Sequence, residues 1–255
     1  MGLQFPTRVE RPGKLPNAAG LAARLWPEFL YHAPVLDRFF DRVLKDYAEY
    51  QFRVWDDERE EVVGAANSIP AAWDGQAATL PNGGLDAVVE QRFEDDPPAP
   101  NVLCAMQIVI DPEYRGRGLS RLMIERMAEI GRDHGLDTLI APVRPTLKDR
   151  YPLIAMERYV EWRREDGTLF DPWLRTHERL GAKILKVAAE STRVPGTVAQ
   201  WEEWADMALP ESGSYVVPGA LVPVQIDLER DEGLYLEPNA WMEHPPPSQP
   251  QAPPR

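Results

Sequence analysis

The chain has 255 residues, which is long enough for one large domain or for a compact domain with extensions. Its net charge of −13 would repel nucleic acid and anionic membranes over most of the surface, so we expect neither as a partner and would favour a cationic acceptor. Because no apolar run approaches the length of a membrane span and residues 1–10 do not resemble a signal peptide, we expect a soluble, cytoplasmic protein.

The N-terminal third is predicted to contain helices and one hairpin. We interpret residues 1–16 as an extended lead-in with an edge strand near residues 4–9, and Asn17 is suited to cap a helix over residues 18–25. Residues 34–47 carry apolar side chains at steps of three and four, which is typical of a helix. An antiparallel hairpin is expected next, followed by a short helix; the strands are residues 50–55 and 61–69, and the helix is residues 85–93.

The middle of the chain reads as strand, Gly-rich turn and helix. Residues 103–110 form an apolar run rich in β-branched side chains, and the apolar positions from Leu119 to Ile130 mark one face of a helix. Residues 138–143 are a second apolar run of β type. Strand, helix and strand in this order predict two parallel strands joined by a right-handed crossover.

The last third alternates between the two kinds of element. We predict helices over residues 154–164, 172–180 and 198–207, and strands over residues 182–188, 215–224 and 234–236. Residues 244–255 are half proline and are expected to form a disordered tail.

The turn between the first central strand and its helix has the properties of an anion site. The first turn of a helix leaves backbone N–H groups without partners and carries the positive end of the helix dipole. Gly116 and Gly118 allow close approach, and Arg115, Arg117 and Arg121 add positive charge to an acidic chain. The expected ligand is a di- or polyphosphate. Neither a Rossmann loop nor a P-loop matches, because the required glycines, lysine and acid are missing.

These residues resemble the acetyl-CoA pyrophosphate loop of the GNAT acyltransferase superfamily, Arg/Gln-x-x-Gly-x-Gly/Ala. Arg115 and Gly118 match this pattern, and Ser120 stands where the family usually has a small apolar residue. The resemblance implies an α/β fold with a central mixed, partly splayed β-sheet flanked by helices, here a single domain over residues 17–243 with a C-terminal extension. It also implies acyl-CoA, either acetyl-CoA or malonyl-CoA, as co-substrate, with no metal. The implied contacts are the backbone of Ile108, Val109 and Ile110, and the loop Arg115, Gly116, Arg117, Gly118, Leu119 and Ser120.

Acyl transfer to an amine needs a base, donors for the oxyanion and an acid for the thiolate, all near the ends of the splayed strands. Arg144 and Thr146 leave the second strand there, and His177 is the best titratable candidate because aromatic and apolar residues surround it in the sequence. Two structural alternatives stay open: Thr146 has the spacing of a helix cap, and His177 would serve equally as a helix histidine bonded to the backbone.

A narrower resemblance concerns the GNAT-like decarboxylase domains that load some polyketide synthases. It rests on residues 141–152 (APVRPTLKDRYP), 157–182 (ERYVEWRREDGTLFDPWLRTHERLGA) and 194–207 (VPGTVAQWEEWADM). It implies catalytic roles for Thr146, His177 and Arg193 in decarboxylating a malonyl thioester, where a hydroxyl and an imidazole would stabilise the enolate.

Three functions therefore remain open. The first is acyl transfer from CoA to an acceptor, which we expect to be an amine. The second is malonyl-type decarboxylation, with or without acetyl transfer to an acyl carrier protein in a polyketide-like pathway. The third is a non-catalytic acyl-CoA-binding regulator. The acceptor is either a small molecule or a carrier protein, and the sequence gives no oligomeric state.

Overall fold

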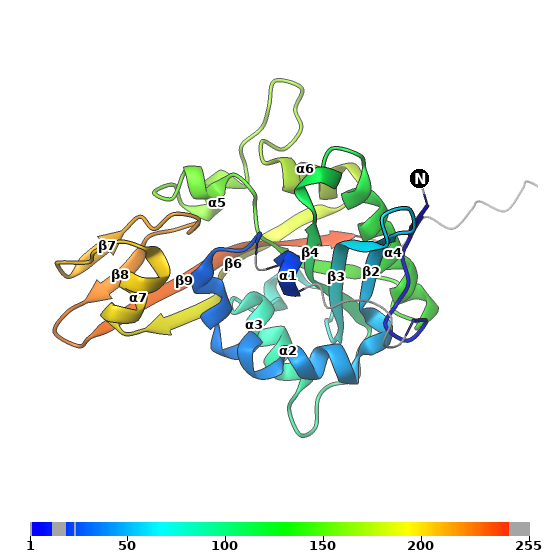
Figure 1. Ribbon diagram of the computed structural model, residues 1–255, viewed down its shortest axis with the longest axis horizontal. Helices are drawn as coiled ribbons and strands as arrows, with labels where there is room; N and C mark the ends of the chain where they lie inside the picture. Colours follow the sequence, from blue (N-terminus) through cyan, green and yellow to red (C-terminus); the bar gives the residue numbers. More distant parts are fainter. Residues whose placement is uncertain (1, 12–18, 23, 245–255) are drawn as a thin grey trace, which may run out of the picture.

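The computed structural model describes residues 2–11, 19–22 and 24–244 (Figure 1). Within this part of the chain, nine strands form one mixed sheet, with the order β1-β2-β3-β4-β5-β9-β8-β7 and with β6 paired to the other edge of β9. Most neighbours are antiparallel, and β4 and β5 are the parallel pair that the crossover predicts. The expected α/β class and mixed, partly splayed sheet are confirmed.

The N-terminal half contributes the first four strands and the helices that precede the loop. The hairpin is confirmed, with Phe52 opposite Ala66 in antiparallel register. The helical and 3-10 segments are α1 (Ala19–Ala22), η1 (Glu28–His32), α2 (Pro34–Asp46), η2 (Ala48–Tyr50), η3 (Ala77–Thr79), α3 (Gly84–Arg92) and η4 (Pro112–Tyr114). The strands are β1 (Leu3–Gln4), β2 (Phe52–Asp56), β3 (Glu61–Ala71) and β4 (Val102–Ile110).

The C-terminal half contributes the crossover helix and the longest strands. Its helical segments are α4 (Leu119–Asp133), η5 (Lys148–Arg150), α5 (Met156–Tyr159), α6 (Pro172–Arg179) and α7 (Val198–Ala205). Its strands are β5 (Leu139–Val143), β6 (Lys183–Gly196), β7 (Gly213–Tyr215), β8 (Val224–Asp227) and β9 (Glu232–His244). In Figure 1, β6 and β9 run side by side through the centre and reach past the other strands toward α7, β7 and β8.

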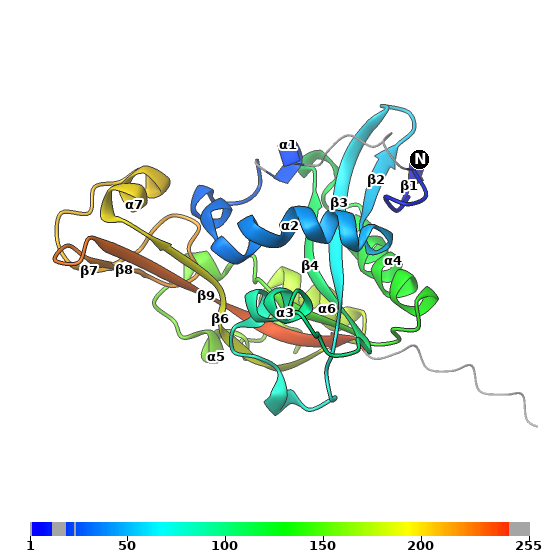
Figure 2. The ribbon, with the colours of Figure 1, turned by 90° about the horizontal axis from the view of Figure 1, so that it is seen from below.

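Helices cover both faces of the sheet, as Figures 1 and 2 show. On one face α4 buries Met123 and Met127 against Leu103 and Leu139, and α6 packs beside it. On the other face α2 and α3 bury Val43 and other apolar side chains against the same strands. Alternate residues along each strand point to opposite faces, so each strand contributes to both cores.

Two predicted elements of the last third are wrong. The predicted strand over residues 215–224 is a loop between β7 and β8, because Gly219 turns the chain at φ +82° and prolines interrupt the hydrogen-bond ladder. The predicted helix over residues 154–164 stops at Tyr159. The turn at Asp166 and Gly167 folds the chain back, so that Arg163 forms a β-bridge to Leu169.

The C-terminal strand is longer than its sequence pattern indicated. The predicted residues 234–236 are a small part of β9, and His244, expected in the tail, is the buried last residue of that strand. The cap expected at Asn17, together with residues 245–255, lies outside the described residues. At the N-terminus, β1 is shorter than the predicted edge strand, which continues only as a bridge from Thr7 to Phe52.

No helix among the residues that the structure describes is long and apolar enough to cross a membrane.

Candidate active site

The two parallel strands separate after a short stretch of pairing. β4 and β5 are in register only at Leu103 with Leu139 and at Cys104 with Ile140. Beyond these pairs β5 continues to Val143 against β9, while β4 continues to Ile110 against β3. The backbone of residues 105–110 therefore has a strand partner on one edge only, and a gap opens between β4 and the β5–β9 pair.

The exposed edge of β4 contains the first group of predicted CoA contacts. Ile108, Val109 and Ile110 pair with Ala66, Ala65 and Gly64 of β3, so their opposite edge faces the gap. The register between β3 and β4 shifts between Asn67 and Ser68, which places Met106 in a bulge. Bulges redirect a strand and are common beside binding sites. An extended ligand with amide groups can pair with an open strand edge of this kind.

The Gly-rich loop ends at the N-terminus of α4, and its amides from residue 116 onward have no hydrogen-bond acceptor among the described residues. Gly116 and Gly118 adopt φ +74° and +78°, which favours glycine, and a Cβ built at either position would meet no atom within 4 Å. The N–H groups of residues 116–120 find no acceptor in the described part of the chain. Five consecutive donors thus surround the positive end of a 15-residue helix, which is a favourable site for a phosphate group.

Some side chains around this loop are exposed, and others are buried in the core. Arg115 is exposed, the Arg117 guanidinium lies 5.0 Å from the Tyr114 ring centre, and Arg121 bonds Glu125 at 2.8 Å. Leu119 is buried in the core under α4, so only its backbone is available to a ligand, and Ser120 is half-buried. Because arginine offers several donors in a planar fork, Arg115 is well suited to a phosphate.

A chain of buried amides leads from β2 to the gap. Gln51 accepts a hydrogen bond from Asn67 at 2.8 Å, and Asn67 accepts one from Gln107 of β4 at 2.8 Å. Gln107 in turn accepts from the indole N–H of Trp26 at 3.2 Å. Buried polar groups in a connected network hold a fixed geometry, because each lost partner leaves an unsatisfied group.

A buried ion pair lies on the opposite side of the gap. Arg144, which follows β5, donates to Glu237 of β9 at 2.9 Å and to the carbonyl oxygen of Gly219 at 2.6 Å. Tyr235 also donates to Glu237, at 2.9 Å. The Arg144 guanidinium lies 5.8 Å from the Trp26 ring centre, so these contacts join β4 to β9 across one side of the gap. Glu237 neutralises Arg144, whereas Lys148, the other cation two positions from Thr146, is buried and donates to the carbonyl oxygens of Tyr151 and Leu221.

A second carboxylate lies near Glu237 without a cationic partner among the described residues. Asp86, in the first turn of α3, is 6% exposed; its Oδ2 accepts from the backbone N–H of Arg193 at 2.9 Å, and its buried Oδ1 has no partner among the described residues. Burial, with a smaller contribution from the nearby charges of Glu90 and Glu237, raises the pKa of Asp86 to about 7. Asp86 is therefore a proton acceptor near neutral pH.

The three predicted catalytic residues lie on three different segments of the chain: Thr146 follows β5, His177 is on α6 and Arg193 is on β6. Thr146 is exposed and donates to Asp171 at 3.4 Å; the 3-10 turn that follows is capped by Leu147, so the helix-cap alternative for Thr146 is wrong. Arg193 is exposed on β6, and only its backbone N–H contacts Asp86. No hydrogen bond between described residues joins any two of the side chains of Thr146, His177 and Arg193, and their catalytic roles stay predictions.

His177 lies in the core between α6 and the end of β9. Its Nδ1 is 2.7 Å from Nε2 of His244, its ring meets Trp173 edge to face at 4.4 Å, and its own Nε2 is buried without a partner in the described chain. Burial, together with the neighbouring His244, holds the pKa of His177 well below 6.5. His244 faces Leu139, where β4 and β5 are still paired, so this histidine pair lies at the closed end of the gap.

Sequence reasoning missed the carboxylates that the fold brings together. Asp86 lies between the buried residues Leu85 and Val88 on the short helix α3, whose buried positions do not form a single stripe. Glu237 alternates with Tyr235 and Asn239 along one face of β9, and all three are buried. The alternation was visible in the sequence, but only the fold shows that Asp86 and Glu237 share a site.

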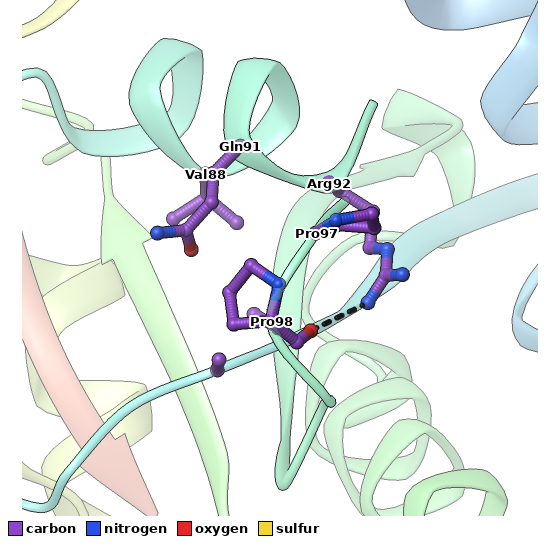
Figure 3. Close-up of a pocket in the computed structure, with 7 residues that line it drawn as sticks. Val88, Gln91, Arg92, Pro97 and Pro98 are labelled. Atoms are coloured by element: carbon purple, nitrogen blue, oxygen red, sulfur yellow. Dashed lines mark hydrogen bonds between the residues drawn. The ribbon is translucent and has the colours of Figure 1, made fainter. Parts of the chain in front are cut away.

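A separate hollow lies between α3 and the start of the connector before β4 (Figure 3). Arg92 closes it with a hydrogen bond to the carbonyl oxygen of Pro98 at 3.2 Å, and Val88 and Gln91 line its wall. Its interior is too narrow to hold a water molecule. Among the described residues, no group of three or more His, Cys, Asp or Glu side chains is placed to hold a metal ion.

Comparisons with known proteins agree with this geometry. The family model described as "Acetyltransferase (GNAT) family" matches residues 19–156. A curated relative, the arginine N-acetyltransferase avaD of Aspergillus versicolor, is 30% identical over 249 residues, which cover 87% of this chain and 85% of that protein.

Two solved structures share the fold over nearly the whole chain. The loading GNATL domain of CurA from Lyngbya majuscula has 17% identity and a TM-score of 0.58, covering 96% of this chain and 98% of its own. The GphF GNAT-like decarboxylase in complex with isobutyryl-CoA has 18% identity and a TM-score of 0.58, covering 96% and 99%.

Proposed function

The chain belongs to the GNAT acetyltransferase family, and from this premise we propose that it transfers an acetyl group from acetyl-CoA to the amino group of arginine or of an arginine-like cation. The observation that carries the proposal is the gap itself: one side offers an open strand edge and a phosphate-binding helix end, and the other side offers buried carboxylates. The first suits the donor and the second suits a cationic acceptor.

The donor fits the exposed edge of β4 and the loop beyond it. The pantetheine arm of CoA has two amides that can pair with the backbone of Ile108 to Ile110, and the pyrophosphate fits the free N–H groups of residues 116–120. Arg115 adds an exposed positive charge. The thioester would then lie in the gap, close to the bulge at Met106.

The acceptor end favours an amine over an acid. Arg144 is already paired with Glu237, so its guanidinium is not free to bind the carboxylate of a malonyl thioester. Asp86, which has no cationic partner among the described residues, supplies negative charge when it is ionised, and this charge attracts an ammonium or guanidinium group. The curated relative is named for arginine acetylation, which is consistent with this charge pattern.

Decarboxylation is the weaker alternative for this chain. The His177 imidazole, which would have to donate to the enolate, lies buried at the closed end of the gap with Nδ1 bonded to His244. The two GNAT-like loading domains are similar in fold, and at 17% and 18% identity that similarity supports the fold alone.

Arginine and citrulline together test the proposal. The two amino acids have nearly the same shape, but citrulline carries a neutral ureido group in place of the guanidinium. We expect N-acetylarginine to form from acetyl-CoA and L-arginine, with kcat/KM for L-citrulline at least about 10-fold lower, because a charge-assisted contact is worth about 1.5–3 kcal/mol. Thiol release and mass spectrometry of the products measure both.

The same assay separates the alternatives. Equal rates with arginine and citrulline would contradict recognition of the cation. Conversion of malonyl-CoA to acetyl-CoA without any acceptor would favour the decarboxylase. Tight CoA binding without transfer to any amine or carrier protein would indicate a regulator.

A further inference from the structure

Asp86 occupies a position that is costly for a carboxylate. It is 6% exposed, it faces two other acids, and one of its oxygens has no partner among the described residues. A buried charge without a counter-ion destabilises a fold, and such groups are rare unless they have a role. The backbone N–H of Arg193 bonds only Oδ2, so the enclosed Oδ1 keeps its lone pairs unpaired among the described residues.

The neighbours of Asp86 belong to both sides of the gap. Asp86 follows Leu85, which with Val89 packs against Met106, the bulged residue of β4. On its other side Asp86 is close enough to Glu237 for their charges to repel, and Glu237 holds Arg144 at the edge of the gap. Asp86 therefore lies between the bulge of β4 and the ion pair of β9.

We propose that Asp86 is the catalytic base, and that its Oδ1 removes the proton from the ammonium group of the acceptor. This inference rests on the proposed function and assigns a residue to the acceptor half of the reaction. Glu237 is less suited to the role because Arg144 and Tyr235 already donate to it.

The step balances as follows. The acceptor arrives as R–NH₃⁺, and Asp86 takes one proton, which frees the nitrogen lone pair. The nitrogen attacks the thioester carbonyl carbon, a C–N bond forms, the C–S bond breaks, and the sulfur leaves with the electron pair as a thiolate. The second proton lost from nitrogen goes to the thiolate, which gives CoA–SH. Asp86 then releases its proton to water.

The charges around Asp86 fit a base that works near neutral pH. Glu90 on its own helix and Glu237 on β9 disfavour its ionised form. On β6, Arg193 has an exposed side chain and Lys186 donates to the carbonyl oxygen of Leu80. Burial and the two acids raise the pKa of Asp86 to about 7, and a base is most effective when its pKa is close to the working pH.

The test replaces Asp86 by its neutral isostere. With acetyl-CoA and L-arginine as probes, Asp86→Asn should lower kcat/KM at pH 7 about 100-fold or more, because general-base catalysis typically contributes at least that factor. The acidic limb that the parent shows near pH 7 should disappear from the variant's pH–rate profile. Glu90→Gln, an exposed acid one turn along the same helix, should retain the parent rate on the plateau.

Two further readouts exclude a merely structural role. The Kd for CoA, measured by calorimetry, should be the same for Asp86→Asn and the parent. The substitution does not change residues 115–120, the loop proposed to bind the acyl donor CoA and called the donor loop below. The folded-state pKa is raised above that of the unfolded chain, so ionised Asp86 lowers stability as pH rises through 7. Asp86→Asn should therefore raise Tm at pH 8.

The outcomes are distinguishable. An active parent with an equally active Asp86→Asn variant and an unchanged pH profile would overturn the role of Asp86 and leave the proposed function standing. A parent that binds CoA and acetylates no amine would overturn the proposed function, and the role of Asp86 with it.

Discussion

His177 and His244 form a buried pair that has to stay uncharged in the folded protein. Burial and the proximity of His244 lower the pKa of His177 well below 6.5, and burial lowers the pKa of His244 to about 4. In a pair of imidazoles one nitrogen donates and the other accepts, so a single proton suffices for the 2.7 Å hydrogen bond between them. Added charge at this site would be buried and unpaired, which is unfavourable.

This pair should make the protein acid-sensitive. Both folded-state pKa values lie below the unfolded value of 6.5, so the unfolded chain binds more protons as pH falls from 6.5 toward 4. The free energy of unfolding should fall with pH in this window, by up to about 1.4 kcal/mol per pH unit for each histidine. Urea denaturation at several pH values measures the slope.

Two variants isolate the contribution of the pair from that of other groups. Replacing both histidines by leucine should flatten the slope between pH 6.5 and 4, since apolar partners of similar size leave nothing to titrate. His134→Gln, on the exposed end of α4, should keep the parent slope. An unchanged slope in the double variant would mean that other groups cause the acid sensitivity.

At the scale of elements, the left-handed backbone conformation of glycine occurs at both ends of α4, and only at the N-terminal end does it lie in the donor loop. Gly118 at the start of α4 and Gly135 just after its end have the same φ, +78°, and at both positions a Cβ would meet no protein atom within 4 Å. The chain thus needs a left-handed residue at each end of the helix for its own geometry. Only Gly118 lies beside the free N–H groups.

The two glycines give a matched pair of variants. Gly118→Val should raise the Kd for CoA at least about 10-fold, because the new side chain stands where the pyrophosphate approaches. Gly135→Val carries the same backbone strain, so it should lower stability similarly and leave the Kd unchanged. Calorimetry with CoA and thermal unfolding separate the two effects. Equal loss of affinity in both variants would show that backbone strain, and not access, is responsible.

Arg115→Glu should add a second, electrostatic loss at the same loop. Reversal of an exposed charge beside a diphosphate should weaken CoA binding most at low salt, because screening reduces the effect above about 0.1 M.

The elements that the sequence predicted well are those whose signals are local. Strand β4, the loop and α4 follow one another without interruption, so apolar periodicity and two glycines define them. Strand β9 was largely missed because its order comes from distant partners: Ala240 pairs with Val143 on one side and with Val187 on the other. The acid cluster was missed for the same reason, since Asp86 and Glu237 are brought together only by the packing of α3 against the sheet.

At the scale of the whole molecule, the net charge of −13 would act in opposite ways on the two proposed substrates. CoA is polyanionic and would be repelled by most of the surface, so its binding would depend on the local arginines of the donor loop. A cationic acceptor is attracted by the surface as a whole and by the buried acids of the gap. The long-range part of this attraction acts over about one Debye length and is screened by salt.

Salt should therefore act on the acceptor in a charge-dependent way. Raising NaCl from about 0.02 to 0.3 M should lower kcat/KM for L-arginine several-fold, because steering weakens as the Debye length falls from about 20 Å to about 6 Å. L-Citrulline has no net charge, so its kcat/KM should change little over the same range. Steady-state rates at saturating acetyl-CoA give both values. If kcat/KM fell equally for both acceptors, the salt effect would come from the donor loop or from the fold. The surface charge would then play no part in the choice of acceptor.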